Sequence, residues 1–451
     1  MSELNELISA GFTQRVAKNR LTRRDVLWLF GAGVAAGALS GCATSPIDGK
    51  RILVGMSEKQ EREIDKEVAP HQFSQDMGPI QDGSVNQYVS SIGGRIHPLT
   101  HRPDMPYSYR VLNANYLNAY TFPGGAMGVT RGILVELDNE AELAALLGHE
   151  MGHVNARHAA QRQGQGLLAQ VAVAGLSIAT ADSGWGTLTA IAGQVGASAL
   201  LSSYSRDNER EADALGQEYM VRAGYPAKGM TQLHGLLVRE SKEQPSLLET
   251  MFSSHPMNSE RYQTAQQLAE AKYAASLNAN PQRERFMDNT AALRKLKPTI
   301  DACKRGETAM AKKKLGEAEN QFDKAVDLTP QDYPSNLLLA KCLTAQGKSG
   351  EALRYAEAAR TLYPQEAQAH KLTGSLKLAQ RDPAAAFAAF DRFDRLLPGD
   401  PGIAFLKGVS LEAGGNRKGA AEQYARFLKS GAQGKPAAHA QQQLKAWGYS
   451  R

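Results

Sequence analysis

Residues 149–153 read His149-Glu150-Met151-Gly152-His153 and lie within a strongly helical run of sequence. Apolar residues recur along this run with helical spacing, and Asn139 and Glu142 at its start are spaced as a capping box. On an α-helix, residues four apart lie one above the other. We therefore expect the imidazoles of His149 and His153 to project toward one point, where they can share a tetrahedral metal ion.

Glu150 lies between the two histidines and, at about 100° per residue, falls within the apolar arc of the same helix. A partly desolvated carboxylate resists ionisation, so its pKa rises. Such a group is suited to take a proton from a metal-activated water and to return it to a leaving amine. Glu150 is therefore the candidate general base. Gly148 and Gly152 lie on the opposite face, where we expect another element to approach closely.

A second acidic helix is predicted for residues 205–213, and it completes the candidate site. Glu209 and Asp213 stand one turn apart on one face. Glu209 can supply a third, oxygen ligand and leave the fourth position for water, which is the arrangement of a catalytic zinc site with one Zn²⁺ per chain. Asp213 would orient His149 by accepting its other ring proton. Glu211 is the rival ligand but points to a different face, and the alternative for the whole segment is a solvated charged helix.

The first 41 residues form an export signal, in which basic residues precede an apolar run that ends at Leu39-Ser40-Gly41-Cys42. The pair Arg23-Arg24 resembles a twin-arginine signal, and the residues around Cys42 resemble the lipobox at which bacterial lipoproteins are cleaved and acylated. We expect export to the periplasm and a lipid anchor on Cys42 in the outer membrane, to which Ala43 is suited by family resemblance. An uncleaved membrane anchor is the alternative.

The rest of the chain divides into a tether at 42–56, a metal-binding domain at 57–290 and a repeat domain at 291–451. Within the metal-binding domain, we expect strands at 107–112, 118–122 and 126–130. The third of these strands would pair with an extended substrate. The low-charge stretch 164–201 reads as a helical hairpin buried against the core, and a lid over the site or a surface that contacts membrane or a partner is the alternative.

The C-terminal third repeats with a period of 34 residues. Five columns of the alignment keep this register, and they include the prolines Pro330, Pro364 and Pro398 and the small residues Gly306, Ala340, Gly374 and Gly408. The large position holds Phe322, Phe390 and Tyr424, with Ala356 as the exception. The pattern resembles tetratricopeptide repeats. We expect about four helix pairs from 299 to 434, a final capping helix, and a concave groove for protein partners.

Composition excludes other classes of function. The net charge of +6 is mild and no basic stripe interleaved with aromatic residues occurs, so we expect no nucleic acid partner. With Cys42 acylated, only Cys303 and Cys342 remain, too few for a disulfide scaffold or a cysteine metal site. We expect both to be buried free thiols, with a single bridge between them as the alternative.

Residues from about 60 to 261 resemble the metalloprotease family that includes the CAAX-processing prenyl protease and bacterial heat-shock membrane proteases. The resemblance rests on the segments 118–125, 149–153 and 209–213. It implies a zinc ion held by His149, His153 and Glu209. It also implies an α+β fold, in which a mainly helical zincin-type domain with a small sheet precedes the all-α repeat solenoid.

With its repeats and export signal, the whole chain resembles the periplasmic β-barrel assembly-enhancing proteases of this family. In that group the histidine of a His-Pro segment reaches the zinc in a self-inhibited form, and His255 fits this position. The resemblance implies a quality-control endopeptidase that degrades misfolded or misassembled envelope and outer-membrane proteins, with contact to the outer-membrane assembly machinery through its repeats. The rivals are an assembly chaperone or adaptor with a mostly latent protease, and, more weakly, a prenyl-peptide protease.

Overall fold

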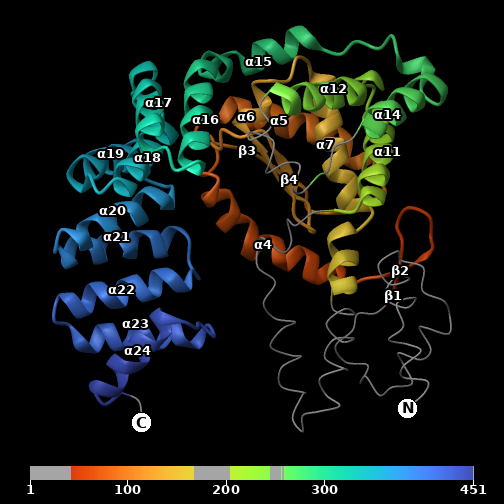
Figure 1. Ribbon diagram of the computed structural model, residues 1–451. Coiled ribbons are helices and arrows are strands. Elements are labelled where there is room, and N and C mark those ends of the chain that lie inside the picture. The colour runs from red at the N-terminus through yellow and green to blue at the C-terminus, as the bar shows by residue number, and fades with distance from the viewer. Residues whose placement is uncertain (1–41, 167–203, 244–254, 256–258, 450–451) are drawn as a thin grey trace, which may run out of the picture.

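The computed structural model describes residues 42–166, 204–243, 255 and 259–449. A mainly helical region surrounds a small sheet, and a stack of paired helices follows it in sequence and packs beside it (Figure 1). The predicted α+β fold with a helical repeat solenoid is confirmed. The predicted signal at 1–41 and most of the predicted hairpin at 164–201 lie outside the described residues.

The first region contains two small sheets and several helices. Its strands and short helices are β1 (Cys42–Thr44), β2 (Arg51–Leu53), η1 (His97–Leu99), β3 (Ser108–Leu112), β4 (Ala119–Thr121), β5 (Ala126–Thr130), α6 (Arg131–Leu134) and η2 (Ala274–Ser276). Its longer helices are α4 (Glu58–Gln75), α5 (Gly83–Ile96), α7 (Glu140–Asn155), α11 (Arg206–Arg222), α12 (Lys228–Glu243), α14 (Ser259–Ala271) and α15 (Arg283–Lys295). Part of the expected tether therefore forms the antiparallel hairpin β1–β2.

The main sheet has three strands in the order β3-β5-β4. β3 runs parallel to β5, with Ser108 opposite Ala126, and β4 runs antiparallel to β5, with Ala119 opposite Val129. The three strands match the predicted segments. However, β5 is the central strand and both of its edges are paired, so it cannot add a substrate strand as we expected. Only β3 and β4 have an outer edge.

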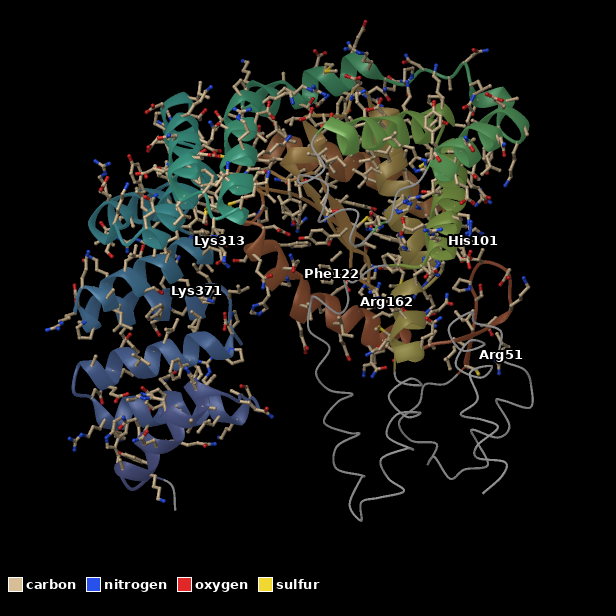
Figure 2. The ribbon with its side chains drawn as sticks, in the orientation of Figure 1. Arg51, His101, Phe122, Arg162, Lys313 and Lys371 are labelled. Atoms are coloured by element: carbon tan, nitrogen blue, oxygen red, sulfur yellow. The ribbon has the colours of Figure 1, made fainter. Side chains whose placement is uncertain are left out.

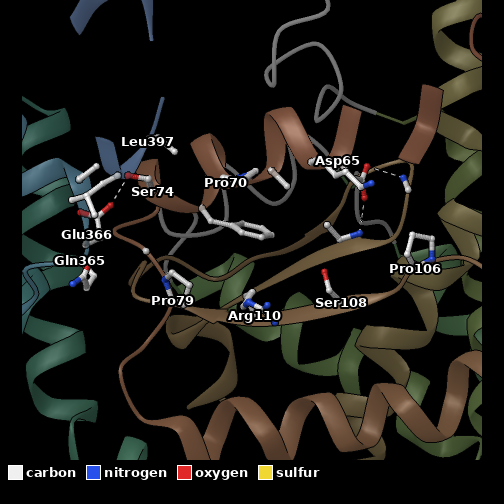
Figure 3. Close-up of a pocket in the computed structure, with 18 of the residues that line it drawn as sticks. Asp65, Pro70, Ser74, Pro79, Pro106, Ser108, Arg110, Gln365, Glu366 and Leu397 are labelled. Atoms are coloured by element: carbon white, nitrogen blue, oxygen red, sulfur yellow. Dashed lines mark hydrogen bonds between the residues drawn. The ribbon is translucent and has the colours of Figure 1, made fainter. Parts of the chain in front are cut away.

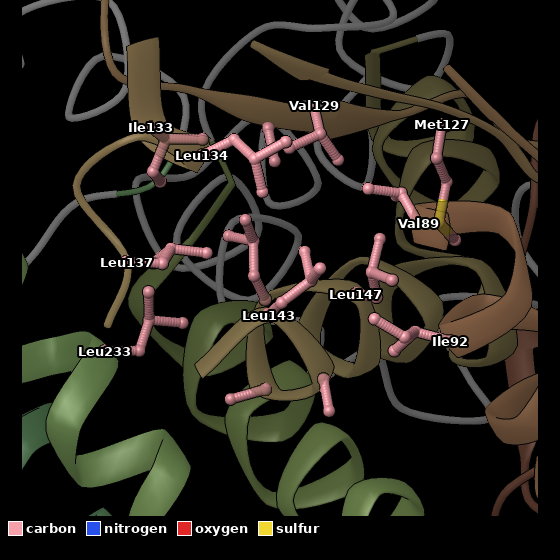
Figure 4. Close-up of a cluster of buried hydrophobic side chains, with 14 of the residues drawn as sticks. Val89, Ile92, Met127, Val129, Ile133, Leu134, Leu137, Leu143, Leu147 and Leu233 are labelled. Atoms are coloured by element: carbon pink, nitrogen blue, oxygen red, sulfur yellow. The ribbon is translucent and has the colours of Figure 1, made fainter. Parts of the chain in front are cut away.

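The main core lies between one face of this sheet and the helices α5, α7 and α12 (Figure 4). Val129 from β5 faces Leu143 and Leu147 of α7, and Ile92 of α5 closes the cluster. Side chains alternate along a strand, so the neighbouring residues point to the other face. There Phe122 and Tyr120 pack against α4 in a second cluster in which Phe122 is fully buried (Figure 2).

Helix α7 crosses the centre of the domain, and every one of its residues is buried. The Asn139 side chain accepts a hydrogen bond from the Glu142 backbone N–H at 3.0 Å, as predicted for its N-cap. The reciprocal bond differs from a capping box, because the Glu142 carboxylate accepts from the backbone N–H of Asp138 instead. Both contacts satisfy donors at the helix start that have no partner within the helix.

The second region is a stack of four antiparallel helix pairs with one more helix at its end, within 297–446, which the structure describes throughout. The helices are α16 (Lys297–Ala311), α17 (Leu315–Leu328), α18 (Tyr333–Ala345), α19 (Ser349–Leu362), α20 (Ala367–Ala379), α21 (Pro383–Leu396), α22 (Pro401–Ala413), α23 (Arg417–Lys429) and α24 (Lys435–Ala446). This is the predicted arrangement of four repeats and a final helix.

The small and large positions of each repeat face one another across a helix pair. A Cβ added to Gly374 would lie 2.6 Å from the Phe390 ring, and one added to Gly408 would lie 2.5 Å from the Tyr424 ring. The second repeat has Ala340 at the small position and Ala356 at the large one, and both are fully buried. The exception at Ala356 is therefore accompanied by a second change, at Ala340. Where the small residue carries a Cβ, no aromatic ring faces it.

Buried polar contacts join the two regions. Arg131 of α6 forms an ion pair with Asp332, with Nη1 and Oδ1 2.6 Å apart and both side chains at most 5% exposed. Ser74 of α4 bonds Glu366, and the Asn115 side-chain amide donates to Glu307 at 3.1 Å. Because buried charges are costly unless they are paired, these contacts fix one orientation of the repeats against the first region.

Cys303 and Cys342 are buried free thiols, as expected, and Cys42 is an exposed one. Burial raises the pKa of the Cys303 thiol to about 12, so that it stays protonated and unreactive at neutral pH. Among the residues that the structure describes, no helix combines the length and apolar composition that crossing a bilayer requires.

Candidate metal centre

Helix α7 presents His149 and His153 one turn apart, as predicted, and helix α11 brings Glu209 to the same point. The two helices touch through their small residues. A Cβ on Gly148 would lie 2.8 Å from the carbonyl oxygen of Gly216, and one on Gly152 would lie 2.7 Å from that of Ala212. The expected close approach at these glycines is confirmed, and α11 is the element that approaches.

Four buried side chains converge here, and one ligand atom from each lies within 4.8 Å of the others: His149, His153, Glu209 and His255. The Nε2 atoms of His149 and His153 are 3.1 Å apart, and His153 Nε2 is 3.3 Å from Glu209 Oε1. His255 Nδ1 lies 3.1 Å from Glu209 Oε1 and 3.4 Å from His149 Nε2. The predicted ligand candidates thus meet at one point.

These separations allow a test of whether the residues fit a metal ion. Ligand atoms at about 2.0–2.1 Å from a tetrahedral zinc ion are separated by about 3.3 Å along each edge. Four of the contacts, at 3.1 to 3.4 Å, agree with that spacing, and His149 Nε2 lies 3.6 Å from Glu209 Oε2. The donor set of imidazole nitrogen and carboxylate oxygen is also the one that zinc prefers. The cluster therefore fits a zinc ion.

Asp213 holds His149 in the orientation that this fit requires. His149 Nδ1 lies 2.9 Å from Asp213 Oδ1, while Nε2 on the other side of the ring lies in the cluster. Burial opposes ionisation of Asp213, but His234 and Arg261 hold the pKa of its carboxyl well below the usual range. The position predicted for Asp213 and its contact with His149 are both observed.

Arg261 is the main component of the site to which the sequence analysis gave no role. Its Nε and Nη2 atoms donate to the two oxygens of Asp213 at 2.6 and 2.7 Å, and Nη1 lies 2.7 Å from Glu209 Oε2. One buried guanidinium therefore fixes the two carboxylates that α11 contributes to the site. The sequence does contain one indication of such a cation. Glu209 and Asp213 lie one turn apart, and two buried acids in this arrangement need a buried cation.

His158 is a second component without a predicted role, and it lies behind His153. The two Nδ1 atoms are 2.9 Å apart, and His158 Nε2 is 3.2 Å from Glu211 Oε2. Glu211, the rival ligand, is thus outside the cluster, and its side chain is 44% exposed. Its contact instead supports the ring that touches His153. Tyr204 also stacks on His153, with ring centroids 3.9 Å apart.

Glu150 lies beside the cluster and is 1% exposed. Burial raises the pKa of its carboxyl, as predicted from the apolar arc of α7. Its Oε1 is 3.8 Å from His255 Nε2, while Oε2 has no hydrogen-bond partner among the described residues. A buried carboxylate oxygen without a partner, next to four converging ligand atoms, is available to a reacting molecule.

The protonation of His153 and Glu209 suits metal binding. Burial lowers the pKa of His153 well below its usual range, which keeps the ring neutral. Burial also opposes ionisation of Glu209, but His255, His153 and His149 hold the pKa of its carboxyl well below the usual range. Neutral imidazole and ionised carboxylate are the forms that act as metal ligands.

Comparison with known proteins finds a family model that matches the part of the chain around this cluster. Residues 84–269 match the model of peptidase family M48, a segment that contains the whole cluster, and residues 309–376 match a tetratricopeptide-repeat model.

The chain is similar to the putative beta-barrel assembly-enhancing protease of Vibrio cholerae, with 29% identity over 289 residues that cover 57% of each chain. It is also similar to the beta-barrel assembly-enhancing protease of Escherichia coli, with 30% identity over 42% of this chain and 40% of that one. Metalloprotease LoiP of Escherichia coli is 31% identical over 35% of this chain and 61% of its own length. The matches thus span about half the length of the assembly-enhancing relatives.

Proposed function

Because this chain carries a domain of peptidase family M48 joined to tetratricopeptide repeats, we propose that it is a zinc-dependent endopeptidase of the bacterial cell envelope. Its substrates are misfolded or misassembled envelope and outer-membrane proteins. This agrees with the names of its relatives, which are called assembly-enhancing proteases.

The convergence of His149, His153 and Glu209 beside a buried Glu150 is the observation that carries this proposal. Three protein ligands with a catalytic carboxylate alongside are the arrangement of hydrolytic rather than structural zinc sites. One bound zinc ion would supply Lewis acidity to a substrate carbonyl and to a water molecule. Glu150 takes a proton from the attacking water and delivers it to the leaving amine.

The outer edge of β4 is the proposed place for the substrate backbone. Phe122 N–H donates to Ala126 and Thr130 N–H donates to Asn118, so these residues use their backbone groups toward β5. In an antiparallel ladder, alternate residues direct their backbone groups to opposite edges of the strand, so the backbone groups of Ala119 and Thr121 point to the outer edge of β4. β4 also packs against the metal-binding helix α7. Pairing with backbone groups is largely indifferent to side chains, which suits a quality-control protease.

His255 is proposed as a reversible fourth ligand that closes the site at rest. Its Nδ1 stands at contact distance from both His149 and Glu209, and it is 3% exposed. A protein ligand in the fourth position excludes the water that the reaction needs. His255→Ala should retain zinc and cleave casein faster than wild type. Equal or slower cleavage would argue against a closing role.

The predicted export signal and Cys42 support a proposal for the location of the protein. We propose that the chain is anchored to the outer membrane by a lipid on Cys42, which is exposed and begins the short hairpin before α4. Labelling cells with a radioactive fatty acid should mark the wild type and leave a Cys42→Ala protein unlabelled.

Cleavage of casein tests the catalytic proposal directly. Glu150→Gln should lower the rate by about two orders of magnitude or more while zinc stays bound. Chelation of wild type should abolish cleavage, and return of zinc should restore it. The control is Glu63→Gln, an exposed carboxylate on α4 that should leave the rate unchanged. Cleavage by Glu150→Gln at the wild-type rate would refute the mechanism.

A chaperone or assembly adaptor is the second candidate. Burial of every cluster residue and the size of the repeat stack favour it, since such a protease would be mostly latent. A deletion strain complemented with Glu150→Gln separates the two candidates. Full rescue supports the adaptor, and loss of rescue supports the protease.

A further inference from the structure

A cavity of about 470 Å³ lies where the two regions of the chain meet, away from the metal-centre residues (Figure 3). Helix α4 forms one wall, strand β3 the other, and the turn after α19 together with the end of α21 closes one end. We call this cavity the junction groove. Residues from both regions line it, so an occupant would contact the protease domain and the repeats together.

Basic side chains line both walls of the junction groove. Arg62 and Lys66 are exposed and stand one turn apart on α4, and Arg110 is exposed on β3. None of the three has a carboxylate within ion-pair distance among the described residues. Within the described part of the chain, Arg110 donates only to the backbone oxygen of Tyr109, at 2.9 Å. Their charges are therefore available to a ligand.

The acidic residues of the junction groove are, by contrast, already engaged. Asp65 accepts backbone N–H bonds from Gly124 and Ala126, each at 2.7 Å, and burial raises the pKa of its carboxyl to about 7. Glu366 is 4% exposed and accepts from the hydroxyls of Ser74 and Tyr333. The charge that the groove offers to a ligand is therefore positive.

Apolar side chains line the junction groove together with the basic ones. They include Ala69 and Phe73 of α4 and Ala126 of β5, and Leu397 from the end of α21 lies at the end formed by the repeats. Phosphate is usually held where several cations and backbone N–H groups converge on one point. Here the cations stand on opposite walls of a groove that apolar side chains also line. This favours an occupant that presents spaced negative charges and apolar groups.

We propose that the junction groove binds an extended polypeptide segment in which acidic residues alternate with apolar ones. In an extended chain, side chains alternate between two sides, so the carboxylates share one side, within reach of the long basic side chains, while the apolar groups on the other side can rest on the apolar lining. The inference rests on the proposed function in one respect, that such a segment belongs to a substrate. The groove then holds part of a substrate away from the metal centre.

Fluorescence anisotropy on the full chain carrying Glu150→Gln tests binding without cleavage. The probe is a short labelled peptide in which Glu alternates with Leu and Phe, and the matched probe has Gln in place of Glu. In the parent protein the acidic peptide should bind about tenfold more tightly than its Gln counterpart, and more weakly as salt rises. Equal binding of the two peptides would overturn the proposal.

Substitutions then locate the site. The triple change Arg62→Gln, Lys66→Gln and Arg110→Gln should weaken binding of the acidic peptide about tenfold. The control is Lys312→Gln, Arg417→Gln and Lys418→Gln, which removes the same charge from exposed positions outside the groove and should change binding less than about twofold.

Unchanged peptide binding by the groove variant would refute the proposal. A lipid headgroup is the competing occupant, tested with vesicles of phosphatidylglycerol against vesicles of phosphatidylcholine. If the groove variant lost binding to the phosphatidylglycerol vesicles but kept its binding of the acidic peptide, the proposal would also be refuted. Because no cleavage is measured, failure of the proposed protease activity leaves these results interpretable.

Discussion

Gly148 of the metal-binding helix lies against Gly216 of the helix that carries Glu209, so closely that each would collide with a side chain on the other. A Cβ on Gly216 would stand 2.6 Å from the backbone nitrogen of His149. The distance between α7 and α11 sets the distance between the two histidines and Glu209. The glycine pair thus defines the dimensions of the metal centre.

Gly148→Ala should therefore separate α7 from α11 and weaken zinc binding. We expect a stability loss of about 1–3 kcal/mol from overpacking, with zinc affinity reduced and casein cleavage lowered. Denaturant unfolding and zinc competition with a chelator measure the two effects. The control is Gly94→Ala in α5, where the added Cβ meets nothing within 4 Å and should leave stability equal or higher. Wild-type zinc affinity in Gly148→Ala would contradict the prediction.

Arg261→Gln should lower zinc affinity by about 10- to 100-fold, the usual effect of removing a group that orients metal ligands. The guanidinium contacts both Asp213 and Glu209, so its loss leaves two buried carboxylates without their cation. The measurement is competition with a zinc chelator. Arg210→Gln is the matched control on the surface of α11, where Arg210 is 41% exposed and pairs with Glu260. It should bind zinc as the wild type does.

The positions of the ligand candidates could be predicted because they depend on local periodicity. One turn of helix separates His149 from His153, and one turn separates Glu209 from Asp213. Arg261 and His158 could not be placed in this way, because their contacts depend on how helices and loops pack in three dimensions. The same limit applied to β5. The sequence indicates a strand at 126–130, whereas its central place in the sheet is a property of the pairing.

The repeat domain was predictable in outline for a different reason. The 34-residue period determines which residues meet across a helix pair. The position that holds small residues therefore indicates the position of the large residue that packs against it. Ala356 is an exception in the sequence pattern, and its physical cause depends on packing: Ala340, at the small position of the same repeat, is fully buried in the same cluster.

Gly374 and Phe390 should behave as one coupled pair. Gly374→Ala alone should destabilise the protein by about 1–3 kcal/mol because the new Cβ meets the ring. Phe390→Ala alone should cost about 3–5 kcal/mol by leaving a cavity. The double variant reproduces the natural pairing of Ala340 with Ala356, so its cost should be smaller than the sum of the two. Calorimetry of the four proteins completes the cycle, and strictly additive costs would contradict the coupling.

Glu136 should make the junction of the two regions sensitive to acid. Its carboxylate lies 2.8 Å from Lys304 Nζ and also bonds Lys297. Burial opposes its ionisation, but Lys304 and Lys297 hold the pKa of its carboxyl below the usual 4.5. A carboxylate whose pKa is lower in the folded state stabilises the fold above pH 4.5, and this contribution is lost as pH falls through the folded pKa.

Glu136→Gln should therefore unfold more easily than wild type at pH 7, by about 1–3 kcal/mol, because it removes charge-assisted bonds to a buried lysine. The difference should shrink as the pH falls below 4.5, because the carboxylate of the unfolded chain binds a proton first and that of the folded chain binds one only at its lower pKa. Denaturant unfolding at a series of pH values measures it. The control is Glu317→Gln, which removes an exposed pair with Lys314 and should leave stability nearly unchanged at every pH. A stability difference that persists unchanged at pH 3 would show that the effect of Glu136 is not carried by its charge.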